Sequence, residues 1–366
     1  MSNAILVIDD DAEHCKKLAD GILAVLQRRD HGSVEVLQWT PGPGDEPLER
    51  FEQFLLKYDV RLVITDYDLT SQGKLGLFGA TVVDWCQLKA LPVGDFSRKN
   101  VDALAKEPNL FELRIHVEAP EVAEQVAELY LGFEEVREAF ATDLDLSSHR
   151  NPAAALATLL NRRALTPQFS QYGNKFASAN ASLVDGLRGN YEDSQRENLR
   201  HKFFVYIAGH ILVNSVLRFA GPLLSRRALA AYLAIRESDV SKVERLFTRA
   251  IYRGPFSGLG PFWWTEDIDE VLDAQREKLD QEFAAVSSGA ERRCLAELAL
   301  GEKLETDPKC TRCGGEEGGL ICPYTDRTVC ERSDCSTPSS TWLPQGARLC
   351  RLEYEFYEEW APILGM

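Results

Sequence analysis

The sequence predicts a multidomain chain with three parts: an α/β domain built on a doubly wound parallel sheet, an all-α middle domain and a small cysteine-rich module. Over the first 120 residues, short apolar runs alternate with amphipathic helical patterns, which is typical of a parallel sheet covered by helices. Helical periodicity then dominates to about residue 300. Six of the nine cysteines follow residue 309. We therefore expect domains at residues 1–120 (extending to 142 if the next helix belongs to the first domain), 121–300 and 301–366.

Length and charge limit the classes of function. The chain has 366 residues, 45% of them apolar and 27% charged, with a formal net charge of −16. A length of about 150 residues per domain predicts two or three domains. The negative charge would repel nucleic acids and anionic membranes, so only a locally basic face is expected to bind either. Residues 203–224 are apolar but interrupted by His210, Asn214 and Arg218. These interruptions favour a buried core helix over a membrane span, and we expect a cytoplasmic protein.

The N-terminal elements follow from their hydrophobic patterns. A continuous apolar run at residues 5–8 predicts a strand that is buried on both faces. Residues 34–39 predict a second strand, and the apolar residues 62–65 predict a third. Helices are expected at residues 12–28, from Pro47 onward and at residues 77–90. Two runs compete for the fourth strand, residues 92–97 and residues 110–117. The second run is the more apolar, because Gly94 and Asp95 interrupt the first.

Acidic residues follow two of the expected strands. Asp9, Asp10 and Asp11 come directly after the first strand, and Asp66 follows the third. Because the carboxyl ends of parallel strands gather at one edge of a sheet, we expect these side chains to lie in one crevice. Mutual repulsion there would be relieved by Mg²⁺, which binds to carboxylates, water and phosphoryl oxygens. In the simpler alternative, the three residues after the first strand only cap the helix that follows.

The segments Ile-Leu-Val-Ile-Asp-Asp-Asp at residues 5–11 and Leu-Val-Ile-Thr-Asp-Tyr-Asp-Leu at residues 62–69 resemble the receiver domains of two-component response regulators. The resemblance implies a flavodoxin-like fold. It also implies that Asp9 and Asp10, with Asp11 as the weaker candidate, bind Mg²⁺ together with Asp66. Asp66 would accept a phosphoryl group from a histidine kinase or a phosphotransfer protein.

The second half of the receiver pattern is atypical. A receiver carries Ser or Thr after its fourth strand and Lys after its fifth. Ser97 lies near the family spacing after Asp66, and would be the switch hydroxyl if residues 92–97 form the fourth strand. If residues 110–117 form that strand, Ser97 is displaced and the fifth strand has no recognisable place. No Lys-Pro pair follows either run, and the nearest approach to one is Lys106, in Lys106-Glu107-Pro108. The resemblance covers about one third of the chain.

A basic stretch lies in the middle of the chain. Residues 201–256 contain nine Lys and Arg residues against three acidic ones. Within it, a helix capped by Ser225 and a second helix at residues 239–249 are similar to a helix-turn-helix. Lys242, Arg245 and Arg249 would then contact DNA. The alternative is an ordinary helical bundle with solvated basic faces. Ala234 stands where such a turn usually has Gly, and Ala would be unfavourable there if the backbone is left-handed.

The C-terminal cysteines predict a closed zinc site. Two thiolates in the run Cys310-Thr-Arg-Cys313-Gly-Gly can bind one ion, and the glycines permit the tight turn. A tetrahedral Zn²⁺ needs two further ligands, for which we favour Cys330 and Cys335, with Cys322 as the alternative. The six histidines are scattered, and we assign none of them chemistry.

These features lead to one functional expectation with an alternative. The chain is expected to be an atypical response regulator in which phosphorylation of Asp66 switches a helical output region, with DNA binding through residues 225–250 as one output. The alternative is a phosphoryl sink or adapter for a histidine kinase that never binds DNA. No nucleophile–base pair or phosphate loop is present, so no enzymatic activity is expected beyond the phosphorylation and dephosphorylation of the receiver itself. The oligomeric state stays open.

Overall fold

The computed structural model describes residues 2–42, 46–69, 77–96, 112–115, 122–142, 148–149, 151–179, 193–278, 289–306, 310–315, 319–339 and 342–360. Contacts divide the chain into two compact units. The first contains Met1–Asn161 and Lys175–His210, and the second contains Arg162–Asn174 and Ile211–Met366. The boundaries between these units do not fall at residues 120 or 300. The expected domain limits therefore remain predictions.

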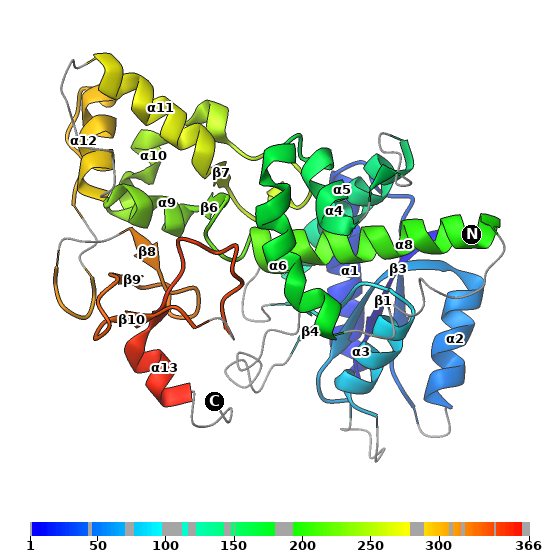
Figure 1. Cartoon of the computed structure of the whole chain (residues 1–366). Helices are drawn as coiled ribbons and strands as arrows, with labels where there is room; N and C mark the ends of the chain where they lie inside the picture. The colour runs from blue at the N-terminus through cyan, green and yellow to red at the C-terminus, as the bar shows by residue number, and fades with distance from the viewer. Residues whose placement is uncertain are drawn as a thin grey trace. The chain divides into compact units, whose positions relative to one another are not determined.

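A parallel sheet forms the centre of the first unit (Figure 1). Its strand order is β2-β1-β3-β4-β5, and every neighbouring pair is parallel. The strands are β1 (Asn3–Ile8), β2 (Glu35–Trp39), β3 (Asp59–Asp66), β4 (Val93–Phe96) and β5 (Leu113–Arg114). The parallel sheet expected for the N-terminal region is therefore present.

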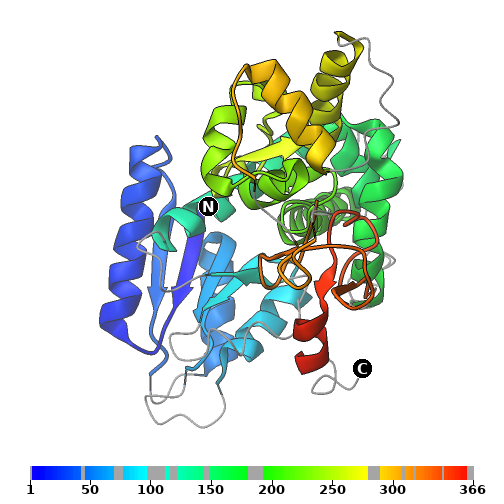
Figure 2. The ribbon, with the colours of Figure 1, turned by 90° about the vertical axis from the view of Figure 1, so that its left-hand side faces the viewer.

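Helices cover both faces of this sheet. They are α1 (Ala12–Arg28), α2 (Pro47–Lys57), α3 (Gly79–Leu88) and α4 (Val122–Thr142). Leu6 and Ile8 of β1 pack in one cluster with Phe51 of α2 and Val82 of α3. Because successive side chains of a strand face opposite sides, the other residues of β1 meet α1 and α4. Figure 2 shows α1, the darkest blue helix, on its side of the sheet. This two-sided burial explains why residues 5–8 are continuously apolar and fully buried.

The fourth strand is β4, which pairs with β3 in the register Asp66 to Phe96. The competing run at residues 110–117 instead supplies β5, in which Leu113 pairs with Gly94. Glycine fits at position 94 because it has no Cβ: a Cβ there would lie only 3.0 Å from Cγ1 of Ile115. The assignment of residues 110–117 to the fourth strand is thus wrong, and the run at residues 92–97 takes that place.

Helices α4, α5 (Pro152–Leu159) and most of α8 (Asp193–Ile211) belong to the same unit as the sheet. Phe133 of α4 contacts His210 of α8 at 5.1 Å between ring centroids. Gly209 makes room for this contact, because its Cβ would lie 2.3 Å from Cε1 of Phe133. None of the helices in the described ranges is long and apolar enough to cross a membrane.

The second unit is mostly helical but also contains short strands. Its helices are the first part of α6 (Thr166–Ala179), a π-helical turn at Leu212–Val216, α9 (Arg226–Leu233), α10 (Val240–Val243), α11 (Thr265–Lys278), α12 (Gly289–Leu300) and α13 (Tyr354–Trp360). Its strands are β6 (Leu223–Ser225), β7 (Phe262–Trp264), β8 (Leu320–Ile321), β9 (Thr328–Val329), β10 (Ser336–Thr337) and β11 (Leu352–Glu353). The middle region is therefore not all-α, because β6 and β7 form an antiparallel pair. The three residues of β7 are aromatic and buried, and aromatic residues are enriched in strands.

Tyr172 of α6 packs against the cysteine-rich segment within the second unit. Its ring is fully buried, and its hydroxyl donates a hydrogen bond to the Phe219 carbonyl at 3.1 Å. Two glycines leave space for the ring: a Cβ would lie 2.4 Å from the Tyr172 hydroxyl at Gly221 and 2.3 Å from ring carbons at Gly346. The segment that carries the cysteines thus shares a core with the helices before it.

Candidate metal centres

The first candidate centre lies at the carboxyl edge of the parallel sheet. Asp9 and Asp10 follow β1, and Asp66 ends β3, which lies beside β1. One carboxylate oxygen of each residue lies within 4.8 Å of the others. Asp9 is fully buried, and Asp10 and Asp66 are 6% and 9% exposed. The expectation that adjacent strand ends bring these carboxylates together therefore holds.

Three negative groups this close, with so little water around them, repel one another strongly. A hard divalent cation such as Mg²⁺ would offset the repulsion, and carboxylate oxygens are its preferred protein ligands. The donor set and the burial thus fit a small cation.

Asp11 has a different task from its two neighbours. Its side chain accepts hydrogen bonds from the backbone N–H groups of Glu13 and His14, at 3.0 and 3.1 Å, and so caps α1. The simpler alternative from the sequence is therefore correct for Asp11 alone. Asp9 and Asp10 instead lie in the acidic group with Asp66, and neither is the N-cap residue of α1.

His14 is the residue at this centre that sequence reasoning missed. Its Nδ1 lies 2.5 Å from Oδ2 of Asp9, while Oδ1 of Asp9 accepts the Asp11 N–H at 2.8 Å. A carboxylate can only accept, so His14 donates from Nδ1. The ring also meets Phe96 edge-on at 5.7 Å. The sequence feature that could have identified His14 is its position in the first turn of the expected helix, five residues after Asp9.

His14 therefore fixes the orientation of a candidate metal ligand. His14→Ala is expected to weaken Mn²⁺ or Mg²⁺ binding about 10–100-fold, because partners that orient ligands typically contribute this much. Titration calorimetry on the full chain would measure it. His31→Ala, an exposed histidine of the same unit, should leave the affinity unchanged. Equal affinities of all three proteins would show that Asp9 needs no support from His14.

The remaining receiver-type residues, Ser97 and Lys106, lie outside the described residues. In the chain, Ser97 directly follows β4, as the receiver pattern requires of its hydroxyl. Lys106 precedes β5, so it does not occupy the place after the fifth strand where a receiver carries its lysine.

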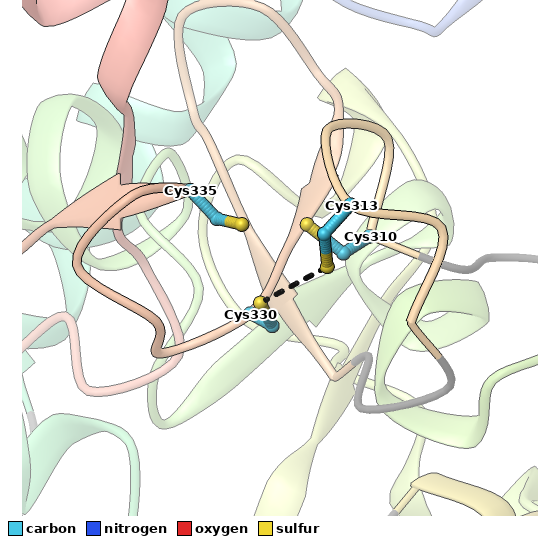
Figure 3. A group of neighbouring side chains, drawn as sticks. All are labelled: Cys310, Cys313, Cys330 and Cys335. Atoms are coloured by element: carbon cyan, nitrogen blue, oxygen red, sulfur yellow. Dashed lines mark hydrogen bonds between the residues drawn. The ribbon is translucent and has the colours of Figure 1, made fainter.

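The second candidate centre is formed by four cysteines. One sulfur each from Cys310, Cys313, Cys330 and Cys335 lies within 4.8 Å of the others. Figure 3 shows the four side chains converging. The first two come from one turn, Cys330 directly follows β9, and Cys335 directly precedes β10. The cysteine set favoured from the sequence is thus brought together, and it could bind a metal ion.

The spacing of these sulfurs fits a tetrahedral ion. The Sγ atoms of Cys313 and Cys330 are 3.8 Å apart. Zinc–sulfur bonds of about 2.3 Å in a regular tetrahedron give edges of about 3.8 Å. Four thiolates without an open position are typical of a structural rather than a catalytic zinc site.

The environment of the thiols favours one thiolate and resists a second. Burial opposes ionisation of Cys310, but backbone hydrogen bonds from Cys313, Arg312 and Cys330 outweigh it and lower its pKa to about 7. Burial, with the neighbouring sulfurs, raises the pKa of Cys335. A bound dication would offset the repulsion between neighbouring thiolates, and the remaining thiols would then lose their protons.

Cys322, the alternative ligand, does not join the group. It is fully buried, and its backbone N–H donates to the Arg327 carbonyl at 2.9 Å. Its electrostatic neighbour is Cys350, whose pKa is raised mainly by burial. Cys350 is buried, and its thiol donates to the Ala220 carbonyl.

The basic stretch at residues 225–250 differs from the expected helix-turn-helix. Its first helix is α9, capped by Ser225, and Ala234 indeed adopts a left-handed backbone with φ 52°. The second helix, expected over residues 239–249, is only the four-residue α10, with 3₁₀ turns at Glu237–Asp239 and Thr248–Ala250.

Two of the three candidate DNA contacts are engaged within the chain. Lys242 pairs with Asp239 at 2.7 Å, and Arg245 pairs with Glu302 at 2.5 Å. The third, Arg249, is exposed. DNA binding would have to compete with the first two ion pairs.

Comparison of the chain with protein-family models, with curated proteins and with solved structures gave no match.

Proposed function

We propose that the chain is an atypical response regulator that accepts a phosphoryl group on Asp66 from a histidine kinase or a phosphotransfer protein. The observation that carries this proposal is the convergence of Asp9, Asp10 and Asp66 at the carboxyl edge of the parallel sheet, within 4.8 Å. The strand order β2-β1-β3-β4-β5 supports it. Flavodoxin-like sheets have this order and bind their ligands beyond the carboxyl ends of the strands.

The chemistry follows from the chain's own groups. Asp66 offers a carboxylate oxygen as the nucleophile toward phosphorus. Asp9 and Asp10, with Asp66, would hold Mg²⁺, which supplies positive charge to the phosphoryl oxygens. His14 keeps Asp9 in place through Nδ1. Ser97 would donate to the bound phosphoryl group, whereas Lys106 receives no role because it precedes β5.

Phosphoryl transfer can be tested by intact-mass measurement of the full chain after incubation with acetyl phosphate and Mg²⁺. The parent is expected to gain one phosphoryl group, and Asp66→Asn to gain none, because it lacks the nucleophilic oxygen. Asp68→Asn is the matched control: this neighbour is exposed and lies outside the acidic group, so it should behave as the parent does. Adducts on both the parent and Asp66→Asn, or on neither, would contradict the proposal.

The output is either DNA binding through residues 225–250 or, as the alternative, an adapter that engages a kinase without binding DNA. The side chains of Lys242 and Arg245 are 40% and 64% exposed in their ion pairs. Such pairs contribute only about 0–1 kcal/mol each, so they do not decide between the two outputs. Electrophoretic retardation of genomic fragments at two salt concentrations separates the two. The adapter predicts no retardation at either, whereas a DNA-binding protein predicts a complex that weakens steeply with salt.

We further propose that the four clustered cysteines hold a structural Zn²⁺, supported by the 3.8 Å spacing of two of their sulfurs. Thiolates kept free for a metal fit the reducing cytoplasm. Elemental analysis of the purified chain tests this, with one zinc per chain as the expected result.

A further inference from the structure

The four clustered cysteines differ in their access to solvent. Cys310, Cys330 and Cys335 are 0%, 3% and 0% exposed, whereas Cys313 is exposed. Of the nine cysteines in the chain, only Cys294 and Cys313 are exposed. Oxidants reach exposed thiolates first, and a second cysteine beside them makes the oxidation reversible.

We propose that Cys313 is a peroxide-sensitive metal ligand whose oxidation forms a disulfide with Cys330 and releases the metal. This inference rests on the zinc site proposed above, and concerns how that site is regulated.

Cys330 is a partner within reach of Cys313. Its Sγ lies 3.8 Å from Sγ of Cys313, and Figure 3 shows the two sulfurs facing each other. A disulfide requires about 2.05 Å, so the sulfurs must approach by less than about 2 Å. This approach requires a movement of the turn that carries Cys313, in which Gly314 has a φ of 66° and open space at the position of a Cβ.

Two groups lie near the sulfur of Cys313. The backbone N–H of Gly315 donates to this sulfur at 3.4 Å. Arg332, which pairs with Asp334 at 3.1 Å, also interacts electrostatically with Cys313 and Cys335.

The reaction balances with one hydroperoxide. The Cys313 thiolate attacks one peroxide oxygen, so that an S–O bond forms, the O–O bond breaks and hydroxide leaves. The Cys330 thiolate then attacks the sulfenic sulfur, forming the S–S bond and displacing a second hydroxide. The two thiolates supply the two electrons, and two solvent protons convert both hydroxides to water.

Metal release follows from ligand number. After oxidation only Cys310 and Cys335 remain as thiolates, whereas a structural zinc site requires four ligands. The ion keeps its charge and leaves for solvent. The turn at Cys310–Cys313 and the strands β9 and β10 then lose the centre that joins them.

The test uses the full zinc-loaded chain carrying Cys294→Ser, which leaves Cys313 as the exposed cysteine. Zinc released by hydrogen peroxide is followed with a chromogenic chelator, and the oxidised chain is mapped by mass spectrometry. The expected result is loss of one zinc per chain together with a Cys313–Cys330 disulfide, and recovery of zinc binding after dithiothreitol.

A second variant separates sensing from metal binding. Cys313→His keeps four ligands, since histidine also binds zinc, but removes the oxidisable sulfur. It should lose zinc at least about tenfold more slowly in peroxide, because the thiolate is the group that peroxide attacks. If Cys313→His does not bind zinc, the disulfide mapped in the oxidised Cys294→Ser chain tests the proposal by itself.

Zinc retained in peroxide while Cys294 of the parent is oxidised would overturn the proposal. So would zinc release with a disulfide between another pair of ligands. If the untreated chain contains no zinc, the zinc site itself is wrong, and this outcome is distinct from a loaded site that resists peroxide.

Discussion

Cys335→Ser is expected to abolish stoichiometric zinc binding and to unfold the cysteine-rich segment. Cys335 is buried and supplies one of the four converging sulfurs. Zinc binding contributes about 10–16 kcal/mol to the folding of zinc-finger peptides at pH 7, which is comparable to the whole stability of a typical domain, about 5–15 kcal/mol. Zinc content by elemental analysis and thermal unfolding by circular dichroism would measure both losses.

Cys322→Ser is the matched control for this prediction, because it changes a buried cysteine of the same segment that lies outside the group. It should keep its zinc and lose only the stability that a buried polar substitution costs, about 1–3 kcal/mol. Retention of zinc in Cys335→Ser with loss in Cys322→Ser would exchange the two residues' roles and refute the ligand assignment.

Tyr172→Ala is expected to destabilise the second unit by about 3–5 kcal/mol, as is typical when a buried aromatic ring is removed. The ring fills the space between Gly221 and Gly346, and the Phe219 carbonyl would lose the hydroxyl donor. Tyr172→Phe keeps the ring and should cost only about 1 kcal/mol. Urea unfolding of both variants measures the difference. Similar losses for both would mean that the hydroxyl, and not the ring, carries the stability.

The two clusters of candidate metal ligands were predictable because each depends on short local signals. An apolar strand followed by aspartates predicts which carboxylates lie at the sheet edge, and two cysteines separated by two residues predict a chelating turn. His14 was not predictable, because its contact with Asp9 depends on how the first turn of α1 places the ring. Asp11 was assigned only by its hydrogen bonds to the start of α1.

Strands β4 and β5 show where sequence patterns fail to predict the structure. The sequence of β4 includes Gly94 and Asp95, which disfavour a strand by propensity, yet all four of its residues are buried. Tertiary packing explains the exception, because Ile115 beside β5 needs the space above Gly94. A single sequence contains no record of that neighbour.

The region after Ala234 shows the opposite error, in which a good pattern did not become a long helix. Val240, Val243 and Phe247 form a buried stripe, yet α10 has only four residues. The chain continues to a 3₁₀ turn at Thr248–Ala250, where the Thr248 hydroxyl donates to the carbonyls of Glu244 and Arg245. The apolar spacing therefore predicted which residues are buried but not the length of the helix.

The central claim is that Asp9, Asp10 and Asp66 form a divalent-cation site at the edge of the sheet. A crystal structure of the full chain with Mn²⁺ in place of Mg²⁺ tests it most directly, through the anomalous scattering of the metal. We expect one anomalous peak within coordination distance of all three carboxylates, and its loss in Asp66→Asn crystals. A map without a peak there, or with Mn²⁺ bound only elsewhere, would contradict the account.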